Sequence, residues 1–269
     1  MATALLWSVG VVAQEMPLFD AHVHYSHDAR ETLPTREAIA LLRKAGVRRA
    51  LVSSSDDEGT QRLLNAAPDL IIPELRPYRT RSDVGTWVRE PDIIRYVEEC
   101  LAKYRYVAIG EFHLFGADAD LPVPRRMVEL AKKYGLMLHA HSDVDAIERL
   151  FKQDPNARIL WAHSGFTDPA SVRAMLRKHK NLWADLAFRA DHVPSGELAP
   201  EWRGAFLEFP NRFMVGSDTY IAERWHFIPE HASTARRWLS ELPREVAERI
   251  GSKNGKEILG GAFAKHRID

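Results

Sequence analysis

Short apolar runs alternate with amphipathic stretches along almost the whole chain. The runs carry Val, Ile and Leu in near-continuous order, which is typical of strands buried on both faces. The stretches between them repeat apolar residues every three or four positions, the period of a helix with one buried side. This alternation predicts strands over residues 16–24, 47–55, 70–77, 106–113, 136–142, 157–165, 182–188 and 212–218. It predicts helices over residues 34–46, 59–68, 91–104, 123–135, 144–155, 168–180, 199–209 and 243–260.

Eight strand-then-helix units indicate a parallel sheet covered by helices, because parallel strands need long crossover connections. This number of units predicts an α/β protein with the (β/α)8 architecture of a TIM barrel. A doubly wound open sheet is the alternative, but its glycine-rich G-x-G-x-x-G loop is absent after the first strand. Without a long linker or a low-complexity segment, residues 15–269 are expected to form a single domain.

Composition excludes several classes of protein. Lysine plus arginine and aspartate plus glutamate number 37 each, so the net charge is zero and no nucleic-acid or membrane surface is expected. Cys100 is the only cysteine, which excludes an intramolecular disulfide and a multi-cysteine zinc site.

The first 14 residues stand apart from this pattern. They are uncharged and mainly apolar, and Val11 and Ala13 resemble an export-signal cleavage site, although no Lys or Arg precedes the apolar core. The run is too short to span a bilayer. We expect residues 1–14 to be an export signal of an exported or periplasmic protein. An N-terminal arm is the alternative, and the protein would then be cytoplasmic.

Five of the predicted strands end in histidine, glutamate or aspartate residues. In a barrel these ends meet at one mouth, where active sites lie. His22 and His24 share a strand face, with Asp20 one pleat below them. The remaining strand-end residues are Glu111, His139, His141, His163 and Asp218.

Nitrogen and oxygen donors at five strand ends indicate a shared cation, because buried ionisable groups are costly unless they are paired or metal-bound. A set without sulfur suits one or two zinc ions, and also manganese, iron or nickel. Separate explanations exist for single residues: Glu111 could pair with an arginine, His163 could be a core histidine, and Asp218 could cap a helix.

These marks resemble the amidohydrolase superfamily of metal-dependent hydrolases, from Leu18 onward. The resemblance rests on H-x-H in the first strand, a carboxylate in the fourth, histidines in the fifth and sixth, and aspartate in the eighth. The "AIGEF" stretch is similar to the TatD-like branch, and the chain length to the amidohydrolase-2 branch, which includes decarboxylases of the aminocarboxymuconate-semialdehyde type. The resemblance implies metal ligation by His22, His24, Glu111, His139, His163 and Asp218.

Two of these assignments carry alternatives. The superfamily usually ligates through the histidine directly after the apolar run, so His139 is taken as the ligand. His141 then lies behind the ligands or in the substrate site. Glutamate stands where two-metal members carry a carboxylated lysine, so a bridge through Glu111 between two ions is one arrangement and a single ion the other.

The expected chemistry is attack by a metal-activated water on a C–N, C–O or P–O bond of a small molecule such as an amide, lactone, ester or phosphoester. Asp218 would accept the proton of that water as general base, and His163 would bind a second ion or stabilise an oxyanion. Basic residues near the mouth suggest an anionic substrate, and a solvated basic loop is the alternative. The expected substrate contacts are His141, Arg76, Arg79, Arg189 and His226.

Two further classes of function remain open on the sequence. A one-metal decarboxylase would release carbon dioxide, and a non-catalytic barrel would bind a metal without turnover. The sequence also leaves open whether the protein forms a homo-oligomer.

Overall fold

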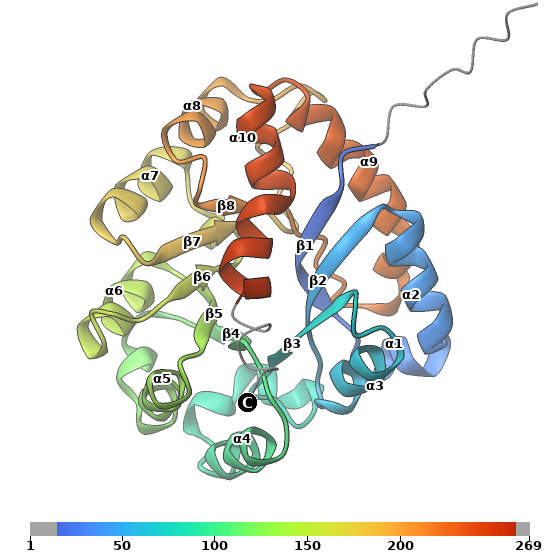
Figure 1. Ribbon diagram of the computed structural model, residues 1–269. Helices are drawn as coiled ribbons and strands as arrows, with labels where there is room; N and C mark the ends of the chain where they lie inside the picture. The colour runs from blue at the N-terminus through green and yellow to red at the C-terminus, as the bar shows by residue number, and fades with distance from the viewer. Residues whose placement is uncertain (1–14, 262–269) are drawn as a thin grey trace, which may run out of the picture.

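A computed structural model describes residues 15–261, so the predicted export signal at residues 1–14 lies outside the described residues. Eight parallel strands follow one another in sequence order around a nearly closed barrel, and helices surround them (Figure 1). This confirms the predicted single-domain (β/α)8 barrel. The strands are β1 (Leu18–His24), β2 (Val47–Ser53), β3 (Ile71–Leu75), β4 (Ala108–Leu114), β5 (Met137–Ser142), β6 (Ile159–Trp161), β7 (Leu182–Asp185) and β8 (Phe213–Met214).

The α-helices lie outside the strands, with their apolar sides against them. They are α1 (His27–Thr32), α2 (Thr35–Lys44), α3 (Glu58–Ala66), α4 (Asp92–Lys103), α5 (Pro122–Tyr134), α6 (Val144–Gln153), α7 (Pro169–Lys178), α8 (Pro200–Glu208), α9 (Ile228–Leu239) and α10 (Arg244–Glu248). No helix between residues 15 and 261 is both long and apolar enough to cross a membrane.

The last part of the fold, from β8 onward, differs from the sequence prediction. β8 has only two residues, and α9 occupies a stretch for which no element was predicted. The predicted final helix, 243–260, begins as α10 and continues through two π-helical segments, Arg249–Lys253 and Lys256–Gly260. This closing segment crosses one end of the barrel (Figure 1), where Leu259 joins the apolar interior.

Between Asp20 and Val23, the strand β1 has one residue more than the part of β2 that faces it. Asp20 pairs with Ala50 and Val23 with Val52, so three steps along β1 match two steps along β2. Such a β-bulge changes the alternation of side chains. His22 and His24 both point into the mouth, as predicted. Asp20 instead lines a cavity under α9, so the prediction that it shares their face is wrong.

The strand β4 has a second bulge, at Glu111. Gly110 pairs with His139 and Phe112 with Ala140, which leaves Glu111 as the extra residue. Gly110 has a φ of +149°, and a Cβ there would lie 2.3 Å from the carbonyl oxygen of His139. Glycine is therefore required for the close approach of β4 to β5 at the residue before Glu111.

The barrel closes between β8 and β1 through a few hydrogen bonds. The Ala21 N–H donates to the Val215 carbonyl over 2.9 Å, and the Asp218 N–H donates to the His22 carbonyl over 2.8 Å. The buried Asp20 carboxylate accepts the N–H groups of His22 and Ser217, at 3.1 and 3.0 Å. Asp20 thus joins the first strand to the segment after the last.

Replacing Asp20 by alanine is expected to lower the free energy of unfolding by about 2–4 kcal/mol, because two buried N–H groups lose their acceptor. Urea denaturation of Asp20→Ala and of the exposed control Asp69→Ala measures the effect. The control should change by less than about 1 kcal/mol. An Asp20→Ala loss no larger than that of the control would contradict this role.

Candidate metal centre

Four donor atoms from three places in the fold converge at the mouth of the barrel. The Nε2 atoms of His22 and His24 lie 3.1 Å apart. Glu111 Oε2 lies 3.7 and 3.3 Å from these two nitrogens, and Asp218 Oδ1 lies 3.7 and 3.5 Å from them. Ligands placed about 2.0–2.2 Å from a tetrahedral ion lie roughly 3.3–3.6 Å from one another. The two histidines and Asp218 therefore fit around one divalent ion, and Glu111 lies at a similar distance from both histidines.

The histidine rings are oriented as metal ligands require. Nδ1 of His22 contacts Asp185 Oδ2 at 3.2 Å, that of His24 the Ser53 carbonyl at 3.3 Å, and that of His163 the Ala187 carbonyl at 2.8 Å. Because these oxygens only accept, each Nδ1 carries the hydrogen. In the neutral ring each Nε2 then presents its lone pair to the cluster, the arrangement that fixes ligating imidazoles.

A second donor set adjoins the first through Glu111. The Oε1 atom of Glu111 lies 2.9 Å from His141 Nδ1 and 3.4 Å from His163 Nε2. The Glu111 carboxylate thus stands between two groups of histidines, one oxygen toward each. Arg76 holds this carboxylate in place, since its guanidinium donates to Oε2 over 2.8 Å and to the Glu111 carbonyl over 3.0 Å.

His139 belongs to a different group of possible ligands, which it forms with His22 and Asp185. Its Nδ1 contacts Glu74 Oε1 at 3.1 Å and its Nε2 contacts Asp185 Oδ2 at 3.0 Å. The bulge at Glu111 explains this placement: Gly110 pairs with His139, and the extra residue carries Glu111 toward His141, further along β5. The geometry therefore brings His141, rather than His139, to Glu111, while the prediction that His139 is the ligand from the fifth strand stays a prediction.

The electrostatics of the cluster favour positive charge. Burial alone would lower the pKa of His22, but Asp185, Asp218 and Glu111 raise it well above its ordinary value. Burial alone would raise the pKa of Glu111, but the histidines around it hold it well below its usual range. His24 differs, since burial lowers its pKa to about 4 and leaves its ring neutral. A cation would find ionised carboxylates and a neutral imidazole here.

Two carboxylates of this site were missed by the sequence interpretation. Asp185 is fully buried at the end of β7, where Oδ2 contacts His22 and His139 and Oδ1 accepts the N–H groups of His163 and Ala187. Glu74, buried in β3, contacts His139. Both carry a signal in the sequence, since each is a carboxylate within a predicted apolar strand.

A cavity of about 340 Å³ opens above the donors. Of the predicted substrate contacts, Arg76 and His141 line it, together with the metal-site residues Glu111, His163 and Asp218. Three others lie elsewhere. Arg79 pairs with Asp83 at 2.8 Å, Arg189 pairs with Asp191 at 2.5 Å, and His226 is exposed outside the cavity lining.

Strained backbone surrounds this cavity. Five non-glycine residues after β6, β7 and β8 have φ values between 48° and 54°, in the left-handed region: His163, Ser164, Phe166, Phe188 and Asp218. Such conformations are unfavourable for residues with a Cβ and cluster at functional sites. Here they set the directions of His163 and Asp218, and of two aromatic rings that line the cavity.

Comparison with known proteins gives one family and several related folds. The sequence model of the amidohydrolase family matches residues 19–261. An uncharacterised TIM-barrel protein from Bordetella bronchiseptica superposes with a TM-score of 0.62 at 13% identity, over 92% of this chain and 99% of that one. A probable 2-pyrone-4,6-dicarboxylic acid hydrolase from Acinetobacter baumannii superposes with a TM-score of 0.62 at 13% identity, over 91% of this chain and 100% of that one. A TatD-family hydrolase from Entamoeba histolytica superposes with a TM-score of 0.57 at 11% identity, over 91% of this chain and 99% of that one. No curated protein matches the sequence.

Replacing Asp185 by alanine is expected to weaken zinc binding by about 10–100-fold, because it removes the acceptor that orients His22. Competition with a chromophoric chelator measures the affinity. The His22→Ala/His24→Ala double variant should bind no ion at the first donor set, and the exposed control Asp118→Ala should bind as the native protein does. Native affinity in Asp185→Ala would show that Asp185 does not support the metal centre.

Proposed function

The chain belongs to the amidohydrolase family, and we propose that it is a metal-dependent hydrolase of a small molecule, with His22, His24, Glu111 and Asp218 as ligands of a first divalent ion. The convergence of these four donor atoms, with separations of 3.1–3.7 Å for the five pairs measured, carries the proposal. His141 and His163, with the other oxygen of Glu111, form a second ion site in this proposal. Zinc is the ion we propose, with manganese, iron and nickel as alternatives.

A divalent ion held there would polarise a substrate oxygen and lower the pKa of a water molecule. Asp218 is the proposed general base, because its carboxylate borders both the donor cluster and the cavity. Its backbone is fixed by the N–H bond to His22 and by Arg224, whose Nε donates to the Asp218 carbonyl. His163 is fixed by Ala187 and by the Asp185 carboxylate. The two residues that would move protons or bear charge are thus held before any substrate arrives.

One contact favours a second function. Arg76 donates to Oε2 of Glu111, the oxygen that faces His22 and His24, and so reduces its capacity to serve as a ligand. A single ion would fit a decarboxylase, in which the bond broken releases carbon dioxide. Metal content of protein purified without a histidine tag distinguishes the two: about two ions per chain supports the hydrolase, and one ion with release of carbon dioxide supports the decarboxylase.

The Asp218→Asn variant is expected to lose at least about 100-fold in kcat, because asparagine cannot accept the proton. It should keep most of its metal, since the amide oxygen still faces both histidines. Screening of amide, lactone and phosphoester substrates with the reconstituted enzyme measures kcat, and elemental analysis measures the metal. Full activity in the metal-loaded variant would overturn the base assignment.

An anionic substrate would be recognised by Arg81, which lines the cavity and is 60% exposed. Its contact with Asp28 is long, at 3.6 Å, so the guanidinium is available. Arg81→Gln is expected to raise KM by about tenfold for a carboxylate-bearing substrate and to leave KM for its uncharged ester unchanged. Arg79→Gln is the matched control, since Arg79 is tied to Asp83. Equal KM changes for both substrates would contradict recognition of the anion by Arg81.

A further inference from the structure

The hydrogen bonds of His113 differ from those of the proposed ligands His22 and His163. In those two rings Nδ1 contacts an oxygen that only accepts, so Nδ1 carries the hydrogen and Nε2 holds the lone pair. His113 lies at the end of β4, and its Nδ1 contacts the hydroxyl group of Tyr78 instead. A hydroxyl group can donate, so this ring can carry its hydrogen on the opposite nitrogen.

Tyr78 sets the tautomer of His113. The Tyr78 side chain is buried, and its oxygen accepts the backbone N–H of His113 over 2.8 Å. The hydroxyl hydrogen needs an acceptor as well, because an unpaired buried O–H group is costly. His113 Nδ1, at 3.2 Å, is the one acceptor that this hydroxyl reaches among residues 15–261. Nδ1 therefore holds the lone pair, and Nε2 carries the hydrogen.

The Nε2 atom of His113 is accessible from the catalytic cavity. It has no hydrogen-bond partner within the described part of the chain, yet it is not among the fully buried polar atoms that lack one. The half-buried ring lines the cavity of about 340 Å³ at the mouth of the barrel. The ring therefore presents an N–H group to whatever enters this cavity.

His113 stands next to the second donor set. The centroid of its ring lies 4.2 Å from that of His141, and by distance alone Glu111, His113 and His141 form a group that could hold a cation. A metal ion needs a lone pair, however, and the one lone pair of the His113 ring is already engaged by the Tyr78 hydroxyl. His113 is therefore a hydrogen-bond donor beside the metal donors, and the group it can bind is an acceptor.

We propose that His113 binds the substrate by donating its Nε2–H to a carboxylate, phosphoryl or carbonyl oxygen held beside the second donor set. This assignment rests on the proposed function, because it names a substrate contact in the same cavity. Tyr78 is a positioning residue, since it fixes the tautomer from behind the ring. Trp87 fixes the backbone, because its indole N–H donates to the His113 carbonyl over 2.7 Å.

Nitrogen–proton correlation spectra of the zinc-loaded chain with isotope-labelled histidine test the tautomer. We expect the His113 hydrogen on Nε2, with the signal assigned by its loss in His113→Gln. Tyr78→Phe should also populate the form with the hydrogen on Nδ1, because the donor that engages the Nδ1 lone pair is then gone. A hydrogen on Nδ1 in the native chain overturns the proposal, whether or not the enzyme turns over a substrate.

Calorimetric titration with methylphosphonate, whose charged oxygens accept hydrogen bonds, tests the contact in the zinc-loaded chain. We expect His113→Phe to weaken binding about tenfold and to leave the zinc content unchanged, because the ring donates to the anion and does not bind the ion. His113→Gln should stay within about threefold of the native affinity, since its N–H group reaches the position of Nε2. Equal weakening in both variants would indicate a structural role and overturn the proposal.

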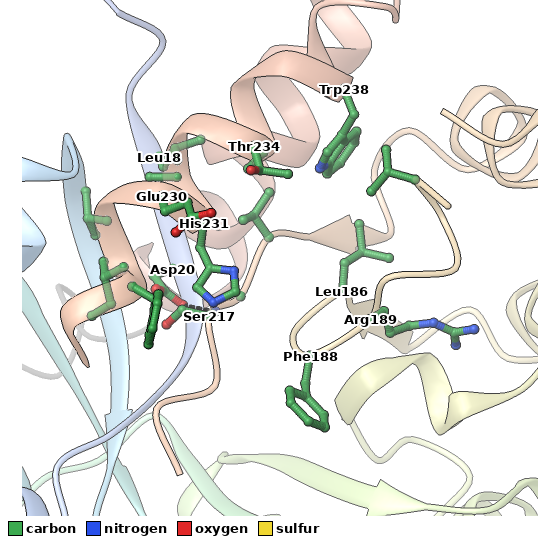
Figure 2. A pocket seen from close by; sticks show the side chains of 18 of the residues that line it. Leu18, Asp20, Leu186, Phe188, Arg189, Ser217, Glu230, His231, Thr234 and Trp238 are labelled. Atoms are coloured by element: carbon green, nitrogen blue, oxygen red, sulfur yellow. Dashed lines mark hydrogen bonds between the residues drawn. The ribbon is translucent and has the colours of Figure 1, made fainter. Parts of the chain in front are cut away.

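His231→Phe is the matched control. His231 lines a separate cavity of about 620 Å³ under α9 (Figure 2), and Phe188 is the one residue between 15 and 261 that lines both cavities. The control should bind methylphosphonate as the native chain does, and weaker binding would place the anion in the wrong cavity.

Three other results would overturn the assignment of His113. They are native affinity in His113→Phe, loss of zinc from that variant, and absence of saturable binding to the native chain up to about 10 mM methylphosphonate. The proposed function fails separately, if the reconstituted chain binds methylphosphonate through His113 but hydrolyses none of the amide, lactone and phosphoester substrates.

Discussion

Four carboxylates buried at one end of the barrel impose the constraint on which the rest of the structure depends. Glu74, Glu111, Asp185 and Asp218 are each at most 5% exposed, and Arg76 is the one guanidinium among the described residues that contacts a carboxylate of this group. Unbalanced negative charge in such surroundings is strongly unfavourable. The imidazoles of His22 and His139 respond by taking up protons more readily than usual. A divalent ion would balance the same charge and release the proton from His22.

The backbone of the barrel is irregular where this charge cluster is built. One bulge turns His22 inward, another carries Glu111 toward His141, and left-handed residues follow the sixth, seventh and eighth strands. In a regular strand the side chains alternate strictly between the two faces. The consecutive residues Ala21 and His22 could then not both point to the inside of the barrel. The unfavourable backbone is held by hydrogen bonds, among them those from the His163 N–H to Asp185 and from the Asp218 N–H to the His22 carbonyl. Regular and irregular parts of the fold therefore have separate tasks: the first provides stability, and the second positions donor atoms.

The sequence predicted the architecture well because apolar periodicity depends on local pattern, and eight repeats of it leave few alternatives. It also identified the strand ends that hold Glu111, His163 and Asp218. The predicted side-chain directions failed where one extra residue changes the strand register, because no residue type around Asp20 or Glu111 marks a bulge. The choice between His139 and His141 stays open, since each histidine belongs to a group of possible metal ligands. The arginines near the mouth could not be ranked either, since their acidic partners Asp83 and Asp191 become neighbours only through local turns of the backbone.

The seam of the barrel, where the segment after β8 meets β1, has a consequence for the lifetime of the protein. His22 and His24 come from the first strand and Asp218 from the segment after the last, so the first donor set exists only once β8 has met β1. The two-residue β8 contributes little pairing of its own. An ion that binds this set binds the closed barrel alone, and its binding free energy adds to that of closure. Metal supply would then govern how often the seam opens, and with it the exposure of the chain to proteases.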